Sequence, residues 1–173
     1  MKSFSNILIL VLALFLFGAT AAVAQNSDSG TLTLEGTVPE ILTINVSAES
    51  VASNLDLSTD QTDLLVATVT ETSNVRAGYS VTVESANAAS QSSTDPFFAS
   101  TSAGNSDTLS YTLKYDGSTV SFSGGSAATV TNASDKTAAG GSTNEVRISY
   151  TGTTQNLYAD SYQDTLTFTI TAK

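Results

Sequence analysis

The C-terminal part of the chain alternates between apolar and threonine residues. Leu166, Phe168 and Ile170 fall on one face of an extended chain, and the threonines at 165, 167, 169 and 171 fall on the other. Because successive side chains of a strand point to opposite faces, this pattern predicts a strand with one buried and one solvated face. Residues 165–171 are therefore expected to complete a β fold.

Similar alternation recurs along the chain, and no segment has a sustained helical period. Asp116-Gly117 is a strong hairpin signal, and residues 73–78 are expected to turn between two paired strands. The other predicted strands are residues 31–38, 41–46, 64–70, 79–84, 108–115, 118–122 and 146–151, with residues 55–57 as a short strand or crossover. About eight short strands with frequent turns favour an all-β antiparallel β-sandwich over a repeat or a large barrel.

Two long polar segments interrupt this pattern. In residues 86–107 the only large apolar cluster is Pro96-Phe97-Phe98, whose rings are expected to cap the core. Residues 123–143 are of low complexity, with two Gly-Gly pairs, and are expected to form a flexible hairpin or an exposed loop.

The N-terminus has the pattern of a secretory signal peptide. Lys2 supplies a positive charge, residues 7–17 are apolar, and Ala22-Val23-Ala24 is a small-x-small cleavage site. Residues 1–24 are therefore predicted to be removed on export, and no membrane insertion is expected afterwards, because the apolar run is shorter than the roughly 20 residues of a spanning helix. The remainder divides into an N-terminal extension, residues 25–38, and one β-sandwich domain, residues 39–173.

The negative net charge of the chain limits the kinds of partner that it can bind. The formal net charge is −10 and becomes −11 when Lys2 is lost with the signal peptide. Nucleic acid and anionic membranes are not expected to bind, because both require clustered Lys or Arg. The chain has no cysteine, so stability must come from packing or from neighbouring subunits.

Residues for common catalytic chemistry are missing from the sequence. With no histidine and no cysteine, the chain lacks the usual general base, thiol nucleophile and common zinc ligands, so we expect no enzyme activity, metal or cofactor. The oxygen-rich cluster of Asn54, Asp56, Asp60 and Asp63 does not follow the calcium-loop pattern and is interpreted as a solvated loop, although weak calcium binding stays open.

Three segments resemble one protein family. Residues 31–39 (TLTLEGTVP), residues 69–74 with 78–83 (VTETSN and GYSVTV) and residues 162–170 (YQDTLTFTI) look like the pilin-like surface domains of the spore coat protein U and Csu-type fimbrial group. The closing Y-x-D-T with its alternating strand is the most specific part. Members of that group often carry a disulfide near the start of the domain, which this chain cannot form.

The resemblance implies a fold and an assembly mode. Such proteins are similar to chaperone–usher pilins, which are incomplete immunoglobulin-like sandwiches filled by the N-terminal extension of the next subunit. Residues 31–38 would then be a donor strand, with Leu32, Leu34 and Val38 filling the groove and Gly36 at a close backbone approach. The implied partners are like subunits in a fibre, a periplasmic chaperone and an outer-membrane usher. The implied location is the periplasm in transit, then the cell surface, a fimbrium or an extracellular matrix.

Two functions stay open at this point. The first is a structural subunit of a surface fibre or matrix that acts through self-association and adhesion. The second is a monomeric exported binding module that recognises a glycan or a protein through residues 86–107 and 123–143, with Phe97, Phe98 or Tyr115 in contact. The pattern alone does not separate them, because a strand packed in its own domain alternates like one packed in a neighbour.

Overall fold

The structure, a computed structural model, describes residues 26–173. The chain divides into two units, Met1–Thr37 and Val38–Lys173. We call the second the β-sheet unit. Residues 26–37, the described part of the first unit, contain no helix or strand. The predicted signal peptide, residues 1–24, lies outside the described residues.

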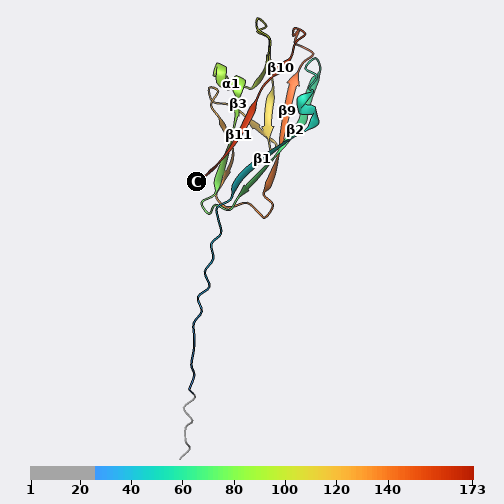
Figure 1. Cartoon of the computed structure of the whole chain (residues 1–173). Helices are drawn as coiled ribbons and strands as arrows, with labels where there is room; N and C mark the ends of the chain where they lie inside the picture. The colour runs from blue at the N-terminus through green and yellow to red at the C-terminus, as the bar shows by residue number, and fades with distance from the viewer. Residues whose placement is uncertain (1–25) are drawn as a thin grey trace, which may run out of the picture. The chain divides into compact units, whose positions relative to one another are not determined.

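One sheet of the β-sheet unit has five strands (Figure 1). Its pairings are antiparallel, and its longest ladder joins β2 to β9. In spatial order the strands are β1 (Leu42–Ala48), β2 (Asp60–Ser73), β9 (Ser142–Thr151), β6 (Thr112–Tyr115) and β7 (Ser118–Val120).

Two further antiparallel sheets have three strands each. The first is ordered β11 (Leu166–Ala172), β3 (Tyr79–Ser85) and β8 (Ala128–Ala133). The second is ordered β10 (Tyr162–Gln163), β4 (Phe97–Ser100) and β5 (Thr108–Ser110). Helix is confined to α1 (Ala86–Gln91) and the 3-10 turn η1 (Ser50–Ser53) in the described residues. The described chain is thus mostly β with antiparallel sheets, as the alternation predicted.

The turn after β2 differs from the prediction. Residues 73–78 were expected to join two paired strands, but β2 belongs to the five-stranded sheet and β3 pairs with β8 and β11. The turn therefore crosses between sheets. Gly78 has φ +87°, and a Cβ there would collide with the backbone of Ala133, so the crossing requires glycine. The hairpin at Asp116-Gly117 is confirmed, since β6 pairs with β7 and both turn residues have positive φ.

Regular elements also lie inside the two polar segments. Residues 86–107 contain α1 and β4, and residues 123–143 contain β8. The single strand predicted for residues 108–115 is divided into β5 and β6 at Tyr111, whose backbone N–H donates to the Pro96 carbonyl instead of continuing a ladder. Residues 55–57 form no strand.

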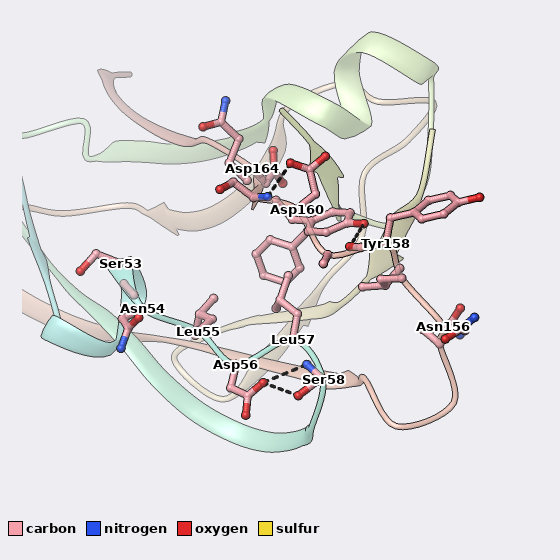
Figure 2. A pocket seen from close by; sticks show the side chains of 18 residues that line it. Ser53, Asn54, Leu55, Asp56, Leu57, Ser58, Asn156, Tyr158, Asp160 and Asp164 are labelled. Atoms are coloured by element: carbon pink, nitrogen blue, oxygen red, sulfur yellow. Dashed lines mark hydrogen bonds between the residues drawn. The ribbon is translucent and has the colours of Figure 1, made fainter. Parts of the chain in front are cut away.

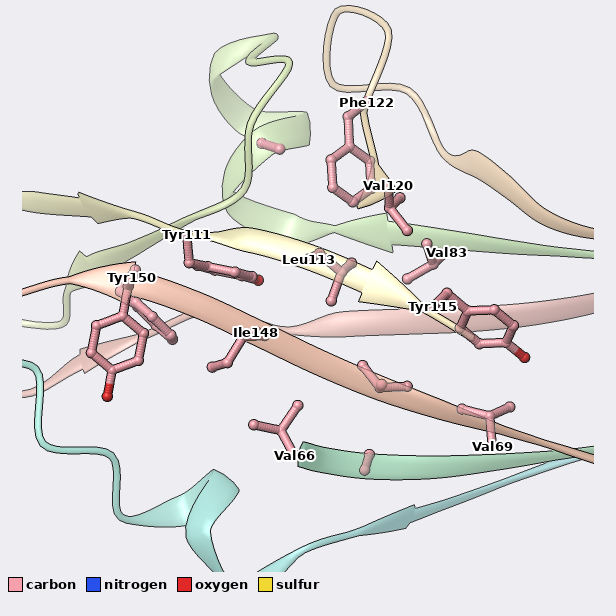
Figure 3. Close-up of a cluster of buried hydrophobic side chains, with 14 of the residues drawn as sticks. Val66, Val69, Val83, Tyr111, Leu113, Tyr115, Val120, Phe122, Ile148 and Tyr150 are labelled. Carbon is pink, nitrogen blue, oxygen red and sulfur yellow. The ribbon is translucent and has the colours of Figure 1, made fainter. Parts of the chain in front are cut away.

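Inward-facing side chains of several strands meet in one apolar core (Figure 3). The alternation places these residues on the inner face of each strand, as the burial of every second residue in β3 and β9 shows. Among residues 26–173, no helix has the length and apolar character needed to cross a membrane. The buried apolar residues of the cluster are Val66, Ala67, Val69, Val83, Ala88, Phe98, Leu109, Tyr111, Leu113, Tyr115, Val120, Phe122, Val146, Ile148 and Tyr150.

Candidate functional site

The predicted donor residues lie in an exposed segment. Leu32 is 83% exposed, Leu34 is 86% exposed and Val38 is 84% exposed. Gly36 shares their face by period two, and an added Cβ there would meet no atom within 4 Å. Large aliphatic side chains that are this exposed and regularly spaced form a candidate binding face.

Asn74 fixes the backbone where the β-sheet unit begins. Its side-chain amide donates to the Pro39 carbonyl at 2.8 Å and accepts from the Ile41 N–H at 2.7 Å. Its own backbone N–H donates to the Ile41 carbonyl at 3.0 Å. These three bonds hold residues 39–41 beside the turn that follows β2, so the path of the chain into β1 is defined.

β1 and β11 form an incompletely covered edge of the β-sheet unit. Each is the outermost strand of its sheet, and within residues 26–173 each has a hydrogen-bonded neighbour on one side only. The inward residues of β2 and β3, such as Val69 and Val83, are fully buried. The apolar residues that face inward on β11 and at the start of β1 are only half-buried: Leu166, Phe168, Ile170, Ala172, Leu42 and Ile44. This edge therefore has both unpaired backbone groups and uncovered apolar surface.

The Y-x-D-T segment holds the start of β11 in place. The Asp164 carboxylate accepts hydrogen bonds from the Ser85 hydroxyl at 2.6 Å, the Tyr111 hydroxyl at 2.7 Å and the Asn87 backbone N–H at 3.1 Å. Ser85 also caps α1 by accepting from the Ala88 N–H. Burial, followed by the Asp164 charge, raises the pKa of Tyr111 far above its usual value. The Asp164 hydrogen bonds thus fix the position of the chain where the edge strand β11 begins.

A buried carboxylate, Glu71, connects the five-stranded sheet to the three-stranded sheet that contains β11. Glu71, on β2, is fully buried and accepts hydrogen bonds from the hydroxyls of Tyr79 at 3.0 Å, Thr131 at 2.7 Å, and Tyr115. Tyr79 and Thr131 lie on the three-stranded sheet that contains β11, whereas Tyr115 lies on the five-stranded sheet. Glu71 therefore connects two sheets through hydroxyl donors.

Burial and the Glu71 carboxylate keep the tyrosines of this cluster protonated. Burial, then the hydrogen bond to Glu71, raises the pKa of Tyr79 to about 12, and the same causes raise the pKa of Tyr115. Because these folded-state values lie above the unfolded one, their contribution to stability is complete below about pH 10. It is lost as the pH rises through the raised values.

A pocket of about 750 Å³ lies at the end of the β-sheet unit where β2 begins (Figure 2). Residues 52–58 and 155–164 line most of it, with the Phe98 ring among the lining residues. Tyr158 stands beside the pocket with 73% of its surface exposed. Three hydrogen-bond donors, Ser100, Ser102 and Asn105, hold the pKa of the Asp160 carboxyl well below its usual range.

Phe97 and Phe98 are largely buried, with 6% and 7% of their surfaces exposed. Phe98 belongs to the apolar core, where its ring packs against Tyr111 with ring centroids 4.6 Å apart, and it also lines the pocket. Tyr115 is also buried. The aromatic side chain that is exposed beside the pocket is Tyr158, which lies outside both polar segments that the sequence singled out.

The oxygen-rich residues proposed as a weak calcium cluster have separate partners. Asp56 accepts from Ser58, Asp60 accepts from Thr153, and Asp63 pairs with Lys114 at 2.9 Å. Within the described part of the chain, no three His, Cys, Asp or Glu side chains gather as a metal site would require.

The sequence matches no protein-family model and no curated protein. The geometry therefore carries the functional argument. Sequence reasoning missed Glu71, Asn74 and Tyr158 as important residues, and the only available signal was the place of Glu71 and Asn74 inside one of the resembling segments.

Proposed function

We propose that this chain is an exported, non-enzymatic structural subunit of a surface fibre or extracellular matrix. It assembles by β-strand addition and mediates adhesion. In this proposal the β-sheet unit is an immunoglobulin-like antiparallel β-sandwich that lacks one strand, and residues 31–38 of another copy supply that strand. The observation that carries the proposal is the presence, in one chain, of an exposed alternating segment and an uncovered apolar edge at β11.

Strand addition would cover both the exposed segment, residues 31–38, and the uncovered apolar edge at β11. An added strand would pair with the free backbone groups of β11 and place every second side chain on its half-buried apolar face. Burial of Leu32, Leu34 and Val38 would contribute roughly 5–9 kcal/mol at about 1.5–3 kcal/mol each, before the cost of ordering the segment. This burial and the main-chain hydrogen bonds of the added strand oppose the cost of association and of ordering the segment.

Side-chain size favours one register. Gly36, which has no side chain, fits best opposite Phe168, the largest side chain of the uncovered face. If the strands are antiparallel, Leu32 then lies opposite the small Ala172. If they are parallel, Leu32 lies opposite the Asp164 carboxylate, which is unfavourable. The antiparallel pairs are Val38 with Leu166, Gly36 with Phe168, Leu34 with Ile170, and Leu32 with Ala172.

The resemblance to pilin-like surface domains supports the same assembly mode. In the proposal, a periplasmic chaperone covers the β11 edge before assembly, an outer-membrane usher exports the subunit, and like subunits replace the chaperone. The absence of cysteine means that packing and subunit contacts supply the stability.

A peptide competition tests the proposal. A synthetic peptide of residues 31–38, added in excess to the chain of residues 25–173, is expected to occupy the β11 edge and shorten the assemblies seen by light scattering. The same peptide with Leu34→Asp is the control and is expected to have no effect, because a carboxylate would have to be buried. A chain that is monomeric without peptide, or assemblies that both peptides leave unchanged, would contradict strand addition.

The pocket beside Tyr158 favours a second candidate function. A pocket with apolar residues at Leu55, Leu57 and Leu157 and one exposed aromatic ring suits a glycan or a protein ligand, as in a monomeric binding module. Under this alternative the chain stays monomeric, and Tyr158→Ala abolishes ligand binding.

A further inference from the structure

Charge is distributed unevenly along the β-sheet unit. We define the loop end as residues 49–60, 86–107, 121–127 and 152–165, which lie where β2 begins and where β3 and β9 end. These residues include no Lys or Arg. Asp56, Asp160 and Asp164 line the pocket at this end (Figure 2). The acidic residues of the loop end are Glu49, Asp56, Asp60, Asp95, Asp107, Asp160 and Asp164.

The opposite end has a different charge. We define the turn end as residues 39–41, 74–78, 134–141 and 173, which lie where β2 and β11 end. It carries Arg76, Lys136 and Lys173 together with Glu40 and Asp135. The other two basic residues of the described chain, Lys114 and Arg147, are paired with Asp63 on the five-stranded sheet. The turn end therefore holds the three basic side chains that do not form ion pairs with Asp63 on that sheet.

The proposed register brings these two ends together in neighbouring copies. With Val38 of one copy opposite Leu166 of the next, the donor leaves the acceptor beside the loop end, because Leu166 begins β11 directly after Thr165, the last residue of the loop end. From Val38 the donor chain has only three residue steps, at most about 11 Å, before it reaches Ile41. Asn74 holds Ile41 at the turn end of the donor copy at 2.7 Å.

We propose that the loop end of one copy docks against the turn end of the next copy, and that their opposite charges steer head-to-tail assembly. This inference rests on the proposed function and names a second contact between the same partners. The loop end carries seven carboxylates and no cation, whereas the turn end carries three cations and two carboxylates, so a loop end attracts a turn end and repels another loop end. The charges thereby oppose head-to-head encounters and align residues 31–38 with the β11 edge before they insert.

Salt dependence of assembly is the first test. For the chain of residues 25–173, we expect the assembly rate measured by light scattering to fall about 10-fold or more between about 0.02 M and about 0.3 M NaCl, because salt screens charge steering. A rate that stays constant or rises over this range would overturn the inference, since net repulsion between acidic chains predicts a rise.

Charge reversal at the turn end is the second test. R76E/K136E changes the turn end from three cations and two carboxylates to one cation and four carboxylates, so that both ends are acidic. This variant is expected to assemble at least about 10-fold more slowly than the native chain at low salt. The difference should shrink at about 0.3 M NaCl, because salt screens the added repulsion.

The control adds two negative charges away from both junction surfaces. S118E/T119E alters exposed positions on β7 and should leave the assembly rate close to native. If R76E/K136E assembles as fast as the native chain at low salt, the head-to-tail charge contact is overturned. If the Leu34→Asp chain assembles as well as the native chain, strand addition itself fails. Assembly that requires Leu34 but does not respond to salt or to R76E/K136E removes only the charge contact.

Discussion

Replacement of Gly36 by leucine is expected to abolish assembly and leave the chain of residues 25–173 monomeric in light scattering. In the proposed register Gly36 lies opposite Phe168, where a leucine side chain has no space. Overpacking of an apolar contact typically costs about 1–3 kcal/mol, and here it would also shift the neighbouring pairs out of register. In the free chain the substitution meets nothing, since no atom lies within 4 Å of an added Cβ.

A compensating change should restore assembly. A chain with Phe168→Ala accepts the larger donor, because the side-chain volume removed is close to the volume that leucine adds. A chain that carries both Gly36→Leu and Phe168→Ala should therefore assemble, because every junction then pairs the larger donor with the smaller acceptor side chain. Gly30→Leu, in the same exposed part of the chain but outside residues 31–38, is the matched control and should assemble normally. Normal assembly of the Gly36→Leu chain would contradict the register.

Glu71→Ala is expected to lower the free energy of unfolding by about 3–5 kcal/mol. The change leaves the hydroxyls of Tyr79, Tyr115 and Thr131 without their buried acceptor and opens a cavity between two sheets. Urea unfolding should be followed in the Leu34→Asp background, in which we expect a folded monomer, so that assembly does not contribute.

Glu84→Ala serves as the control for this measurement. Glu84 lies on β3 and is exposed, so its loss should change the free energy of unfolding by no more than about 0.5 kcal/mol. If Glu71→Ala costs less than about 1 kcal/mol, the carboxylate does not join the sheets as described.

Alternation predicted most of the strands, because β3, β9 and β11 each have one inward face with a regular apolar period. It did not predict which sheet each strand joins. The residues around Asn74 look like a hairpin turn, and only the positions of β8 and β9 show that the turn crosses between sheets. β4 and β8 were missed because their short alternation lies in segments rich in serine, threonine and alanine.

The site was predictable only in part. The exposed donor face of Leu32, Leu34 and Val38 follows from period two, but the edge that would receive it depends on strand order. Glu71 could not be identified, because a buried carboxylate is stable only where tertiary contacts supply donors, and its three hydroxyls come from distant strands. Phe97 and Phe98 were considered as ligand contacts as well as core caps; both are buried, and Phe98 also lines the pocket at the loop end.

The most direct measurement of strand addition uses disulfide trapping, since the native chain has no cysteine. Thr37 and Thr167 are exposed and lie opposite each other in the antiparallel register, with Cβ atoms about 4.5–5.5 Å apart, close to disulfide range. A Thr37→Cys chain mixed with a Thr167→Cys chain should give a crosslinked heterodimer on a non-reducing gel. A Thr169→Cys partner, which the parallel register would favour, should give far less. If the first pair forms no heterodimer, residues 31–38 do not add to β11 of another copy in this register, and the central proposal fails.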